Sequence, residues 1–459
     1  MGNVTRLPAA AVDPMASVIR PLRPASKPTL LRNALIPDSD GDGYLRRDVL
    51  IADGLLVKIA PAGTLATPRD GGRFVDCTHR MLLPGFFNAH THSVQHWVRG
   101  LIMPLPLELW VLQLIQHEPR GNGGWNGSES FDKTPALAVG VSAMLCGVEA
   151  LLSGCTAIMD HHYIRNCEDM ATAVAAYKAV GIRAFIAPML DDDAELYQNF
   201  IPLCSAAEEV NRRAHAAGCA CGSRGMRADG NFRERPGGSD AEKTKKQLAL
   251  WEECVERFHR PDEGIHVVIG PDMLEALKLA TIIHTASTPE YRDWPTARFT
   301  ALTLAARNGY RSVNFGGDAG GGELLEGRVA DVTLWDLTAL SLLPRTDPLS
   351  LLVLGSRTQA PGAGSGLDAA WVDGVLTVEG GSPVGIDLPA LRALIIILQS
   401  DYRSTAVTDP SLLPHTAAAE VEYRAAFCLD APDGGGTVTP ELARYEQGRT
   451  LYDPTLPTA

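Results

Sequence analysis

The segment Met81–Ser93, MLLPGFFNAHTHS, carries the strongest structural signal in this chain of 459 residues. It is a short apolar run, bounded by Pro-Gly, that ends in polar residues, a pattern typical of a fully buried parallel strand. Residues two apart on a strand point to the same side, so His90 and His92 can reach one metal ion. Imidazole is a good zinc ligand, although two histidines fill half of a zinc shell. The alternative is a chance HxH pair on a loop.

Three similar apolar runs follow this segment, and helical patterns lie between them. Strand then helix, repeated, predicts βαβ units on a parallel sheet, whose chemistry lies at the carboxyl ends of the strands. The predicted strands are 156–160, 183–190 and 265–270, and the predicted helices are 136–152, 169–180, 273–286, 296–308 and 390–399.

Runs typical of β-strands flank this α/β centre on both sides. LRNALI and RRDVLIADGLLVKIAP precede it, and GELLEGRVADVTLWDL and AAWVDGVLTVEGG follow it. Alternation and Asp-Gly turns predict antiparallel strands here. The predicted domains are a disordered segment over 1–28, a composite β-sandwich from 29–78 and 315–388, an incomplete α/β barrel over 79–314, and a C-terminal helix and tail over 389–459.

Composition and charge narrow the class of function. Hydrophobic residues make up 45% and charged residues 21%, which is ordinary for a soluble globular protein, and the net charge of −13 argues against nucleic-acid or anionic-membrane partners. No stretch reaches the roughly 20 apolar residues of a membrane span, and the N-terminus has no signal-peptide pattern. The nine scattered cysteines favour a reducing compartment. We therefore expect a cytoplasmic protein.

The run LPGFFNAHTHS resembles the first-strand signature of the amidohydrolase superfamily, metal-dependent hydrolases of C–N bonds. The flanking strands resemble the two halves of that family's small β-sandwich, and together the motifs cover roughly residues 29–380. The resemblance implies an α/β fold, a (β/α)8 TIM-type barrel of the metal-dependent hydrolase kind plus a β-sandwich formed by N- and C-terminal segments. It also implies that His90 and His92 bind one divalent ion, zinc or iron.

Within the superfamily, SGCTAIMDHHY over residues 153–163 resembles the second strand of deaminases acting on cytosine, purines, S-adenosylhomocysteine or s-triazines. The resemblance implies a small heterocyclic substrate. Gln95 lies where some of these relatives carry a substrate-contacting glutamine; a loop glutamine with no such role is the alternative. His161 and His162, at the same edge as His90 and His92, are the nearest candidates for substrate contact or replacement metal ligands.

The motifs of the later barrel strands are not found in the sequence. The family completes its site with histidines on strands five and six, a Glu after the first of these, and an Asp on strand eight. Here residues 265–271 resemble strand four, and the sequence from Asp272 onward already resembles the helix after strand eight. We therefore expect a barrel truncated by loss of strands five to eight. If this run is instead a remnant of strand eight, Asp272 is a candidate metal ligand and catalytic residue.

Three hypotheses on function remain open. The first is hydrolytic deamination, or a similar substitution, at a heteroaromatic carbon. The second is a catalytically inactive, truncated relative with a binding or structural role. The third is a metal-sequestering protein that uses His90, His92 and His162. A truncated barrel would expose two strand edges, so we also expect a homo-oligomer.

Overall fold

A computed structural model of the protein describes residues 15–22, 27–38, 43–69, 71–99, 135–162, 166–189, 241–268, 296, 298–343, 346–355 and 366–396. The chain divides into two compact units. One comprises Met1–His96, Ala136–Met189 and Leu250–Leu398, and the other Trp97–Pro135, Leu190–Ala249 and Gln399–Ala459. All the strands and sites described below belong to the first unit.

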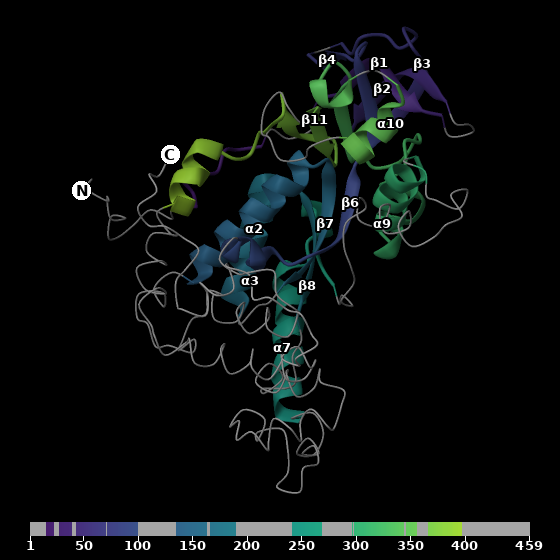
Figure 1. The fold of residues 1–459 in the computed structure, drawn as a ribbon. Helices are drawn as coiled ribbons and strands as arrows, with labels where there is room; N and C mark the ends of the chain where they lie inside the picture. Colours follow the sequence, from purple (N-terminus) through teal and green to yellow (C-terminus); the bar gives the residue numbers. More distant parts are fainter. Residues whose placement is uncertain are drawn as a thin grey trace, which may run out of the picture. The chain divides into compact units, whose positions relative to one another are not determined.

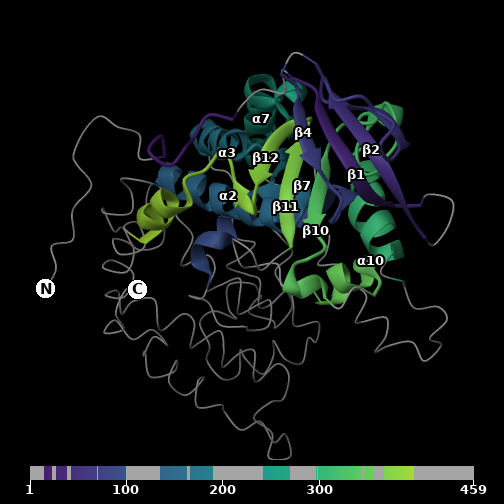
Figure 2. The same cartoon turned by 90° about the horizontal axis from the view of Figure 1, so that it is seen from above.

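A nine-stranded sheet joins the two β-rich flanks of the sequence (Figures 1 and 2). Strands β5 and β10 pair antiparallel, which brings residues near position 80 beside residues near position 335. The order is β13-β12-β11-β10-β5-β1-β2-β3, with β4 paired to β1. The strands are β1 (Thr29–Pro37), β2 (Tyr44–Ala52), β3 (Leu55–Pro61), β4 (Arg73–Asp76), β5 (Arg80–Pro84), β10 (Val332–Asp336), β11 (Leu367–Val372), β12 (Val375–Glu379) and β13 (Ser382–Pro383).

The interior of this sheet follows from alternation along its strands. Leu31, Val49 and Leu334 are fully buried and belong to one apolar cluster with Leu82 and Trp371. Alternate residues of a strand point to opposite faces, so one apolar face per strand is enough to build this core.

A second sheet has four parallel strands in the order β6-β7-β8-β9, as the repeated strand–helix pattern predicts. Among the described residues it ends at β6 on one side and β9 on the other, and no strand closes it into a barrel. The strands are β6 (Phe86–Thr91), β7 (Cys155–His162), β8 (Arg183–Pro188) and β9 (Ile265–Val267), and the helices between them are α2 (Pro135–Leu152), α3 (Cys167–Val180) and α7 (Ala241–Phe258).

The prediction of one strand over residues 81–93 is wrong, because Gly85 divides the run between the two sheets. β5 ends at Pro84 in the first sheet, and β6 begins at Phe86 in the second. The Gly85 N–H donates to the carbonyl oxygen of Asp331 at 2.8 Å. A Cβ at Gly85 would lie 1.8 Å from Oγ1 of Thr156, so only glycine allows the chain to cross this closely. An apolar run cannot reveal such a division, since both halves are buried.

Helices cover both faces of the parallel sheet. α3 is capped by the Asn166 side chain at its start and by Gly181, with φ 78°, at its end, and its Tyr177 contacts β7. On the other face, Tyr310 packs against Phe87 of β6, with ring centroids 5.3 Å apart. The predicted helix over 296–308 is a π-helix, η4 (Phe299–Asn308), followed by α9 (Gly309–Ser312), and the predicted helix over 390–399 spans 388–396 in the structure. The predicted helix over 273–286 lies outside the described residues.

Short helical segments complete the fold. They are η1 (Ser93–Val98), η2 (Pro261–Glu263), η5 (Gly317–Ala319), η6 (Leu340–Leu342), α10 (Pro348–Ser350) and η7 (Leu351–Gly355). Among the helices of the described ranges, none combines the length and apolarity needed to cross a membrane.

Part of the predicted disordered N-terminus is ordered. Met15 and Val18 are 4% and 0% exposed, and Ile19 forms a β-bridge with Ile386. The sulfur of Met15 lies so close to Gly140 of α2 that a Cβ there would stand 2.5 Å from it. Burial against α2 therefore orders residues 15–22, despite a Pro- and Ala-rich composition that favours disorder.

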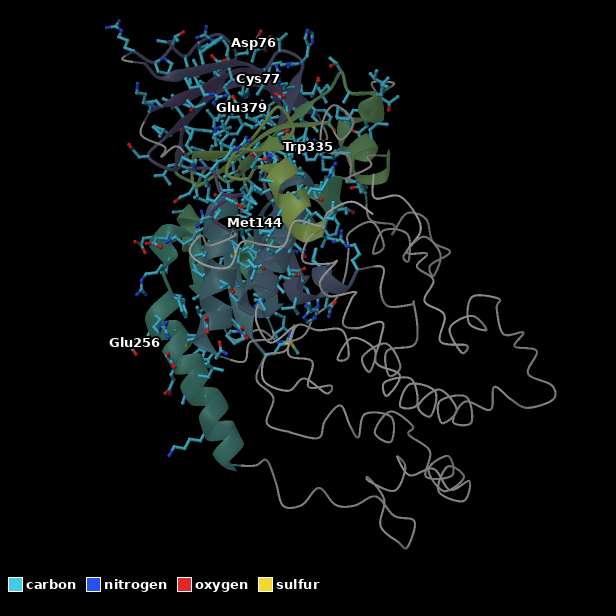
Figure 3. All side chains as sticks on the ribbon, turned by 90° about the vertical axis from the view of Figure 1, so that its left-hand side faces the viewer. Asp76, Cys77, Met144, Glu256, Trp335 and Glu379 are labelled. Carbon is cyan, nitrogen blue, oxygen red and sulfur yellow. The ribbon has the colours of Figure 1, made fainter. Side chains whose placement is uncertain are left out.

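The two sheets are joined by a buried ion pair. Nε and Nη2 of Arg183, on β8, donate to the two carboxylate oxygens of Asp331 at 2.9 and 3.1 Å, and both side chains are at most 2% exposed. Tyr310 also donates to Asp331, at 2.8 Å. A second contact lies nearby, where Trp335 (labelled in Figure 3) covers Gly154 at the start of β7.

Replacing Arg183 by Met should reduce the free energy of unfolding by about 3–5 kcal/mol, because it leaves the buried Asp331 carboxylate without its cation. Urea denaturation followed by circular dichroism measures this loss. The control is Lys178→Ala, which removes the partly exposed pair with Glu263 and should cost less than about 1 kcal/mol. Similar losses in both variants would contradict a special role for the buried pair.

Candidate functional site

Three histidines gather at the carboxyl ends of β6 and β7. The ring centroids of His90 and His92 lie 4.6 Å apart, and the His161 ring is 5.5 Å from His92 and 6.4 Å from His90. The sequence predicted His90, His92, His161 and His162 at this edge, and the structure brings His161 to the pair. Parallel α/β folds bind ligands at this edge of the sheet.

The orientation of His92 suits a metal ligand. Its Nδ1 lies 2.8 Å from the backbone carbonyl oxygen of His161, so Nδ1 carries the proton and donates it. Nε2 is then the nitrogen with a lone pair available to an ion, and histidines that bind a metal usually donate their other ring N–H to an oxygen in this way.

The donor set fits a divalent ion in part. His90 and His92 supply half of a tetrahedral shell. Across the described ranges, no group of three His, Cys, Asp or Glu side chains is already gathered to hold an ion. By ring separation, His161 is the nearest further imidazole. A complete shell of metal ligands needs a side chain to move or a ligand from elsewhere.

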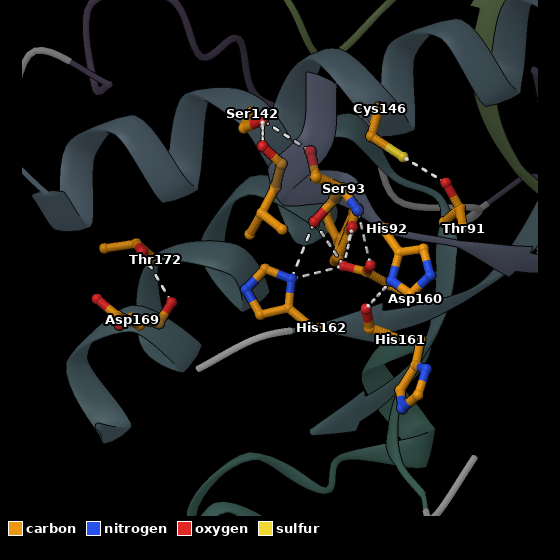
Figure 4. A network of polar contacts seen from close by, with 12 residues as sticks. Thr91, His92, Ser93, Ser142, Cys146, Asp160, His161, His162, Asp169 and Thr172 are labelled. Carbon is orange, nitrogen blue, oxygen red and sulfur yellow. Dashed lines mark hydrogen bonds and ion pairs between the residues drawn. The ribbon is translucent and has the colours of Figure 1, made fainter. Parts of the chain in front are cut away.

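Asp160, near the carboxyl end of β7, anchors the chain directly after His92 (Figure 4). Its carboxylate accepts the Ser93 backbone N–H at 2.9 Å and the Ser93 hydroxyl at 2.7 Å. Nδ1 of His162 and the Tyr177 hydroxyl donate to the same carboxylate at 2.8 and 2.6 Å. Ser142 of α2 donates to the Ser93 carbonyl at 2.7 Å. Ser93, the residue that follows the HxH pair, is therefore held from β7 and α2, and Tyr177 of α3 holds Asp160 in turn.

This network keeps Asp160 ionised. Burial by itself would raise the pKa of Asp160, but attraction to His162 and the hydrogen bonds from His162, Tyr177 and Ser93 hold that pKa well below its usual range. Burial and the Asp160 carboxylate raise the pKa of Tyr177 well above its ordinary value, so its hydroxyl remains a donor.

The predicted substrate residues have different surroundings. Gln95 lies in η1 and is partly buried, and its backbone N–H donates to the His92 carbonyl at 3.0 Å. The His162 side chain is 0% exposed and turned toward Ser93 and Asp160, on the side of β7 opposite to His161 (Figure 4). Adjacent residues of a strand alternate in this way. Asp272 lies outside the described residues.

Sequence reasoning gave Asp160 no role, although the signal was present. Asp160 directly follows the largely apolar run CTAIM in β7, and a charged residue in such a strand must find partners when it is buried. The partners are Ser93 of η1, His162 of β7 and Tyr177 of α3, and only the folded chain brings them together.

Aromatic side chains fill the same face of the sheet below the three histidines. Phe87, Ala157, Phe185 and Tyr310 form one buried cluster. His266 of β9 stacks on Phe185, with ring centroids 4.3 Å apart. It is therefore separate from the histidines at the carboxyl edge.

Comparison with known proteins places this site in a family context. Residues 81–250 match the sequence model of the amidohydrolase family. A 5-methylthioadenosine/S-adenosylhomocysteine deaminase from Shouchella clausii is 27% identical over 172 residues, which cover 38% of this chain and 34% of that protein. The chain thus spans about a third of the length of this curated relative.

Solved structures show a similar fold. A triazine hydrolase from Arthobacter aurescens has a TM-score of 0.54 and 19% identity, over 81% of this chain and 99% of that chain. An adenosine deaminase from Xanthomonas campestris with bound zinc has a TM-score of 0.54 and 17% identity, over 82% of this chain and 98% of that chain.

Replacing Asp160 by Asn should reduce the free energy of unfolding by at least about 3 kcal/mol, because an amide cannot accept from four donors and carries no charge for His162. Chemical denaturation at pH 7 measures the loss. Asp76→Asn is the matched control, since Asp76 is exposed and lies in the other sheet. Equal stability of the two variants would contradict the anchoring role of Asp160.

His266 should make stability depend on pH. Burial, with nearby Arg183 and His259, lowers the pKa of His266 from 6.5 to about 4. The unfolded chain therefore takes up a proton at a higher pH than the folded chain, so stability is full above about pH 6.5 and falls as the pH drops toward 4. Unfolding measured from pH 7 to 4 should show a smaller decline in His266→Phe, which keeps the stacking on Phe185. An unchanged decline in that variant would exclude His266 as the cause.

Proposed function

Because the chain belongs to the amidohydrolase superfamily, we propose that it is a metal-dependent hydrolase of non-peptide C–N bonds that acts on a small heterocycle. The convergence of His90, His92 and His161 at the carboxyl edge of the parallel sheet carries this proposal. The substrate class is supported by the relatives, one of them a deaminase of adenosine-type nucleosides and another a triazine hydrolase.

In this proposal His90 and His92 hold one divalent ion, with zinc as the first candidate and iron as the second. Such an ion lowers the pKa of a water molecule toward neutrality and so supplies a nucleophile at ordinary pH. The His161 carbonyl keeps the proton of His92 on Nδ1, which leaves Nε2 for the ion. Asp160 holds Ser93 and thereby restrains the backbone beside His92.

Gln95 and His162 take different roles in the proposal. The amide of Gln95 follows the metal-binding pair by three residues and can both donate to and accept from a heterocycle. The ring of His162 is fully buried against Asp160. We therefore propose that His162 positions Asp160 and Ser93 instead of contacting substrate.

We also propose that the barrel lacks strands five to eight. The sequence likeness of Asp272 onward to the helix after strand eight supports this, as does a parallel sheet with four strands among the described residues. Such a chain would need ligands beyond His90 and His92 from another source, and His161 is the nearest described candidate. The homo-oligomer and the cytoplasmic location stay predictions.

The metal content of the purified protein tests the proposal. After removal of metal with a chelator and reloading with zinc, the wild type should retain about one ion per chain, and His90→Ala should lose it because half of the histidine pair is gone. The control is His79→Ala, which removes an exposed histidine outside the site and should retain the ion. Release of ammonia from adenosine-type and s-triazine substrates is then measured on the loaded protein.

Two results would contradict parts of this proposal. Absence of bound zinc in the wild type would mean that the truncated barrel cannot close the site. Zinc that is bound and lost in His90→Ala, without ammonia release from any heterocycle, would favour the metal-binding or structural alternative over a hydrolase.

A further inference from the structure

A cavity lies beside α9 and the glycine-rich loop that follows it. Its volume is about 130 Å³, and none of its lining residues belongs to the histidine cluster. This volume is below the range of roughly 300–1,000 Å³ that is typical of sites for drug-sized ligands. The cavity is large enough for a small ion. The lining is formed by Arg307, Tyr310, Arg311, Asn314, Phe315, Gly317, Gly320, Gly321, Glu323 and Arg328.

The described side chains that line this cavity carry excess positive charge. Three are arginines, and Glu323 is the one carboxylate among them. Glu323 accepts from Nη2 of Arg328 at 2.9 Å, and Nη1 of Arg328 donates to the Gly317 carbonyl at 3.0 Å. The charge of Arg328 is thus matched within the protein, while those of Arg307 and Arg311 have no carboxylate partner within the lining.

Arg307 has an unused donor. Its Nε is buried and has no hydrogen-bond acceptor within the part of the chain that the structure describes. Its Nη2 lies 3.4 Å from the Thr303 hydroxyl, a long contact. A guanidinium is always charged, and a buried N–H without an acceptor is costly. Because this Nε is closed to solvent, an anion in the cavity would stabilise the charge of the guanidinium as a whole and would not bond to Nε.

The glycine-rich loop packs closely on the residues beside the arginines. Gly316 and Gly317 have φ values of 70° and 52°, in the left-handed region that favours glycine. A Cβ at Gly320 would lie 2.1 Å from the Phe315 carbonyl oxygen, and one at Gly321 would lie 2.5 Å from the Tyr310 ring. Concave backbone turns of this kind commonly accompany anion sites.

We propose that this cavity binds a small oxyanion such as phosphate, with Arg307 and Arg311 as its ligands. Arg328 borders the site and is held in place by Glu323. Planar guanidinium groups match the oxygens of phosphate in a bidentate manner, and they also bind sulfate or a carboxylate. This site is independent of the metal site and of the hydrolytic function proposed above.

Isothermal titration of the full chain with inorganic phosphate, at constant ionic strength, tests the proposal. We expect saturable binding that is weakened by about tenfold or more in Arg307→Gln, through loss of a charge-assisted hydrogen bond. Arg311→Gln should weaken binding similarly, and this exposed residue can be changed without disturbing the fold. Arg69→Gln, an exposed arginine outside the cavity, is the matched charge control and should bind as the wild type does.

Competing anions identify the class of ligand. Displacement of phosphate by sulfate but not by acetate would support a tetrahedral oxyanion, and equal displacement by acetate would support a carboxylate ligand for the same arginines. No saturable heat in the wild type would overturn the proposal. The same holds if Arg307→Gln, Arg311→Gln and Arg69→Gln all weaken binding equally, since that result indicates attraction to the general surface charge.

Discussion

The arrangement of the two sheets depends on the hydrogen bonds that the buried Asp331 carboxylate accepts. It accepts two hydrogen bonds from Arg183 of β8, one from Tyr310 of α9 and one, at 2.6 Å, from the backbone N–H of Asp373. The backbone carbonyl oxygen of Asp331 accepts a hydrogen bond from the Gly85 N–H. Burial would lower the pKa of Arg183, but Asp331 raises it, so the guanidinium stays charged. Two buried charges are tolerated only when both are satisfied in this way.

The position of the histidine pair follows from this junction. Gly85 leaves the first sheet beside Asp331, and β6 begins one residue later. His90 and His92 then lie at the far end of β6, next to the carboxyl end of β7. The contact between Gly85 and Thr156 brings β6 and β7 together at their starts, and the bonds between Ser93 and Asp160 bring them together at their ends. The orientation of the two imidazoles is therefore set by contacts at both ends of one short strand.

The histidine site and the arginine cavity differ in how the chain builds them. The histidines stand on strands and are supported by buried side chains such as Asp160, whereas the arginine cavity is formed by α9 and a loop rich in glycine. Tyr310 lines the cavity and also contacts Phe87 of β6, the strand that leads to the histidines. Packing in the interior thus connects the histidine cluster and the arginine cavity, which have no residue in common.

The amino-acid sequence by itself determined strands β7, β8 and β9, helices α2 and α3, the two β-rich flanks and the HxH pair, because these follow from local periodicity and a short motif. It did not predict helix α7 between β8 and β9. It could not show that the run over residues 81–93 divides at Gly85, since hydrophobicity does not distinguish one buried strand from two. Alternation along β7 places His162 on the side of Asp160 and His161 on the opposite side, but only packing against α3 decides which of the two sides is buried. The partners of Asp160 and Asp331 lie far apart in sequence, so the tertiary structure alone decided where these buried charges are satisfied and where the histidines meet.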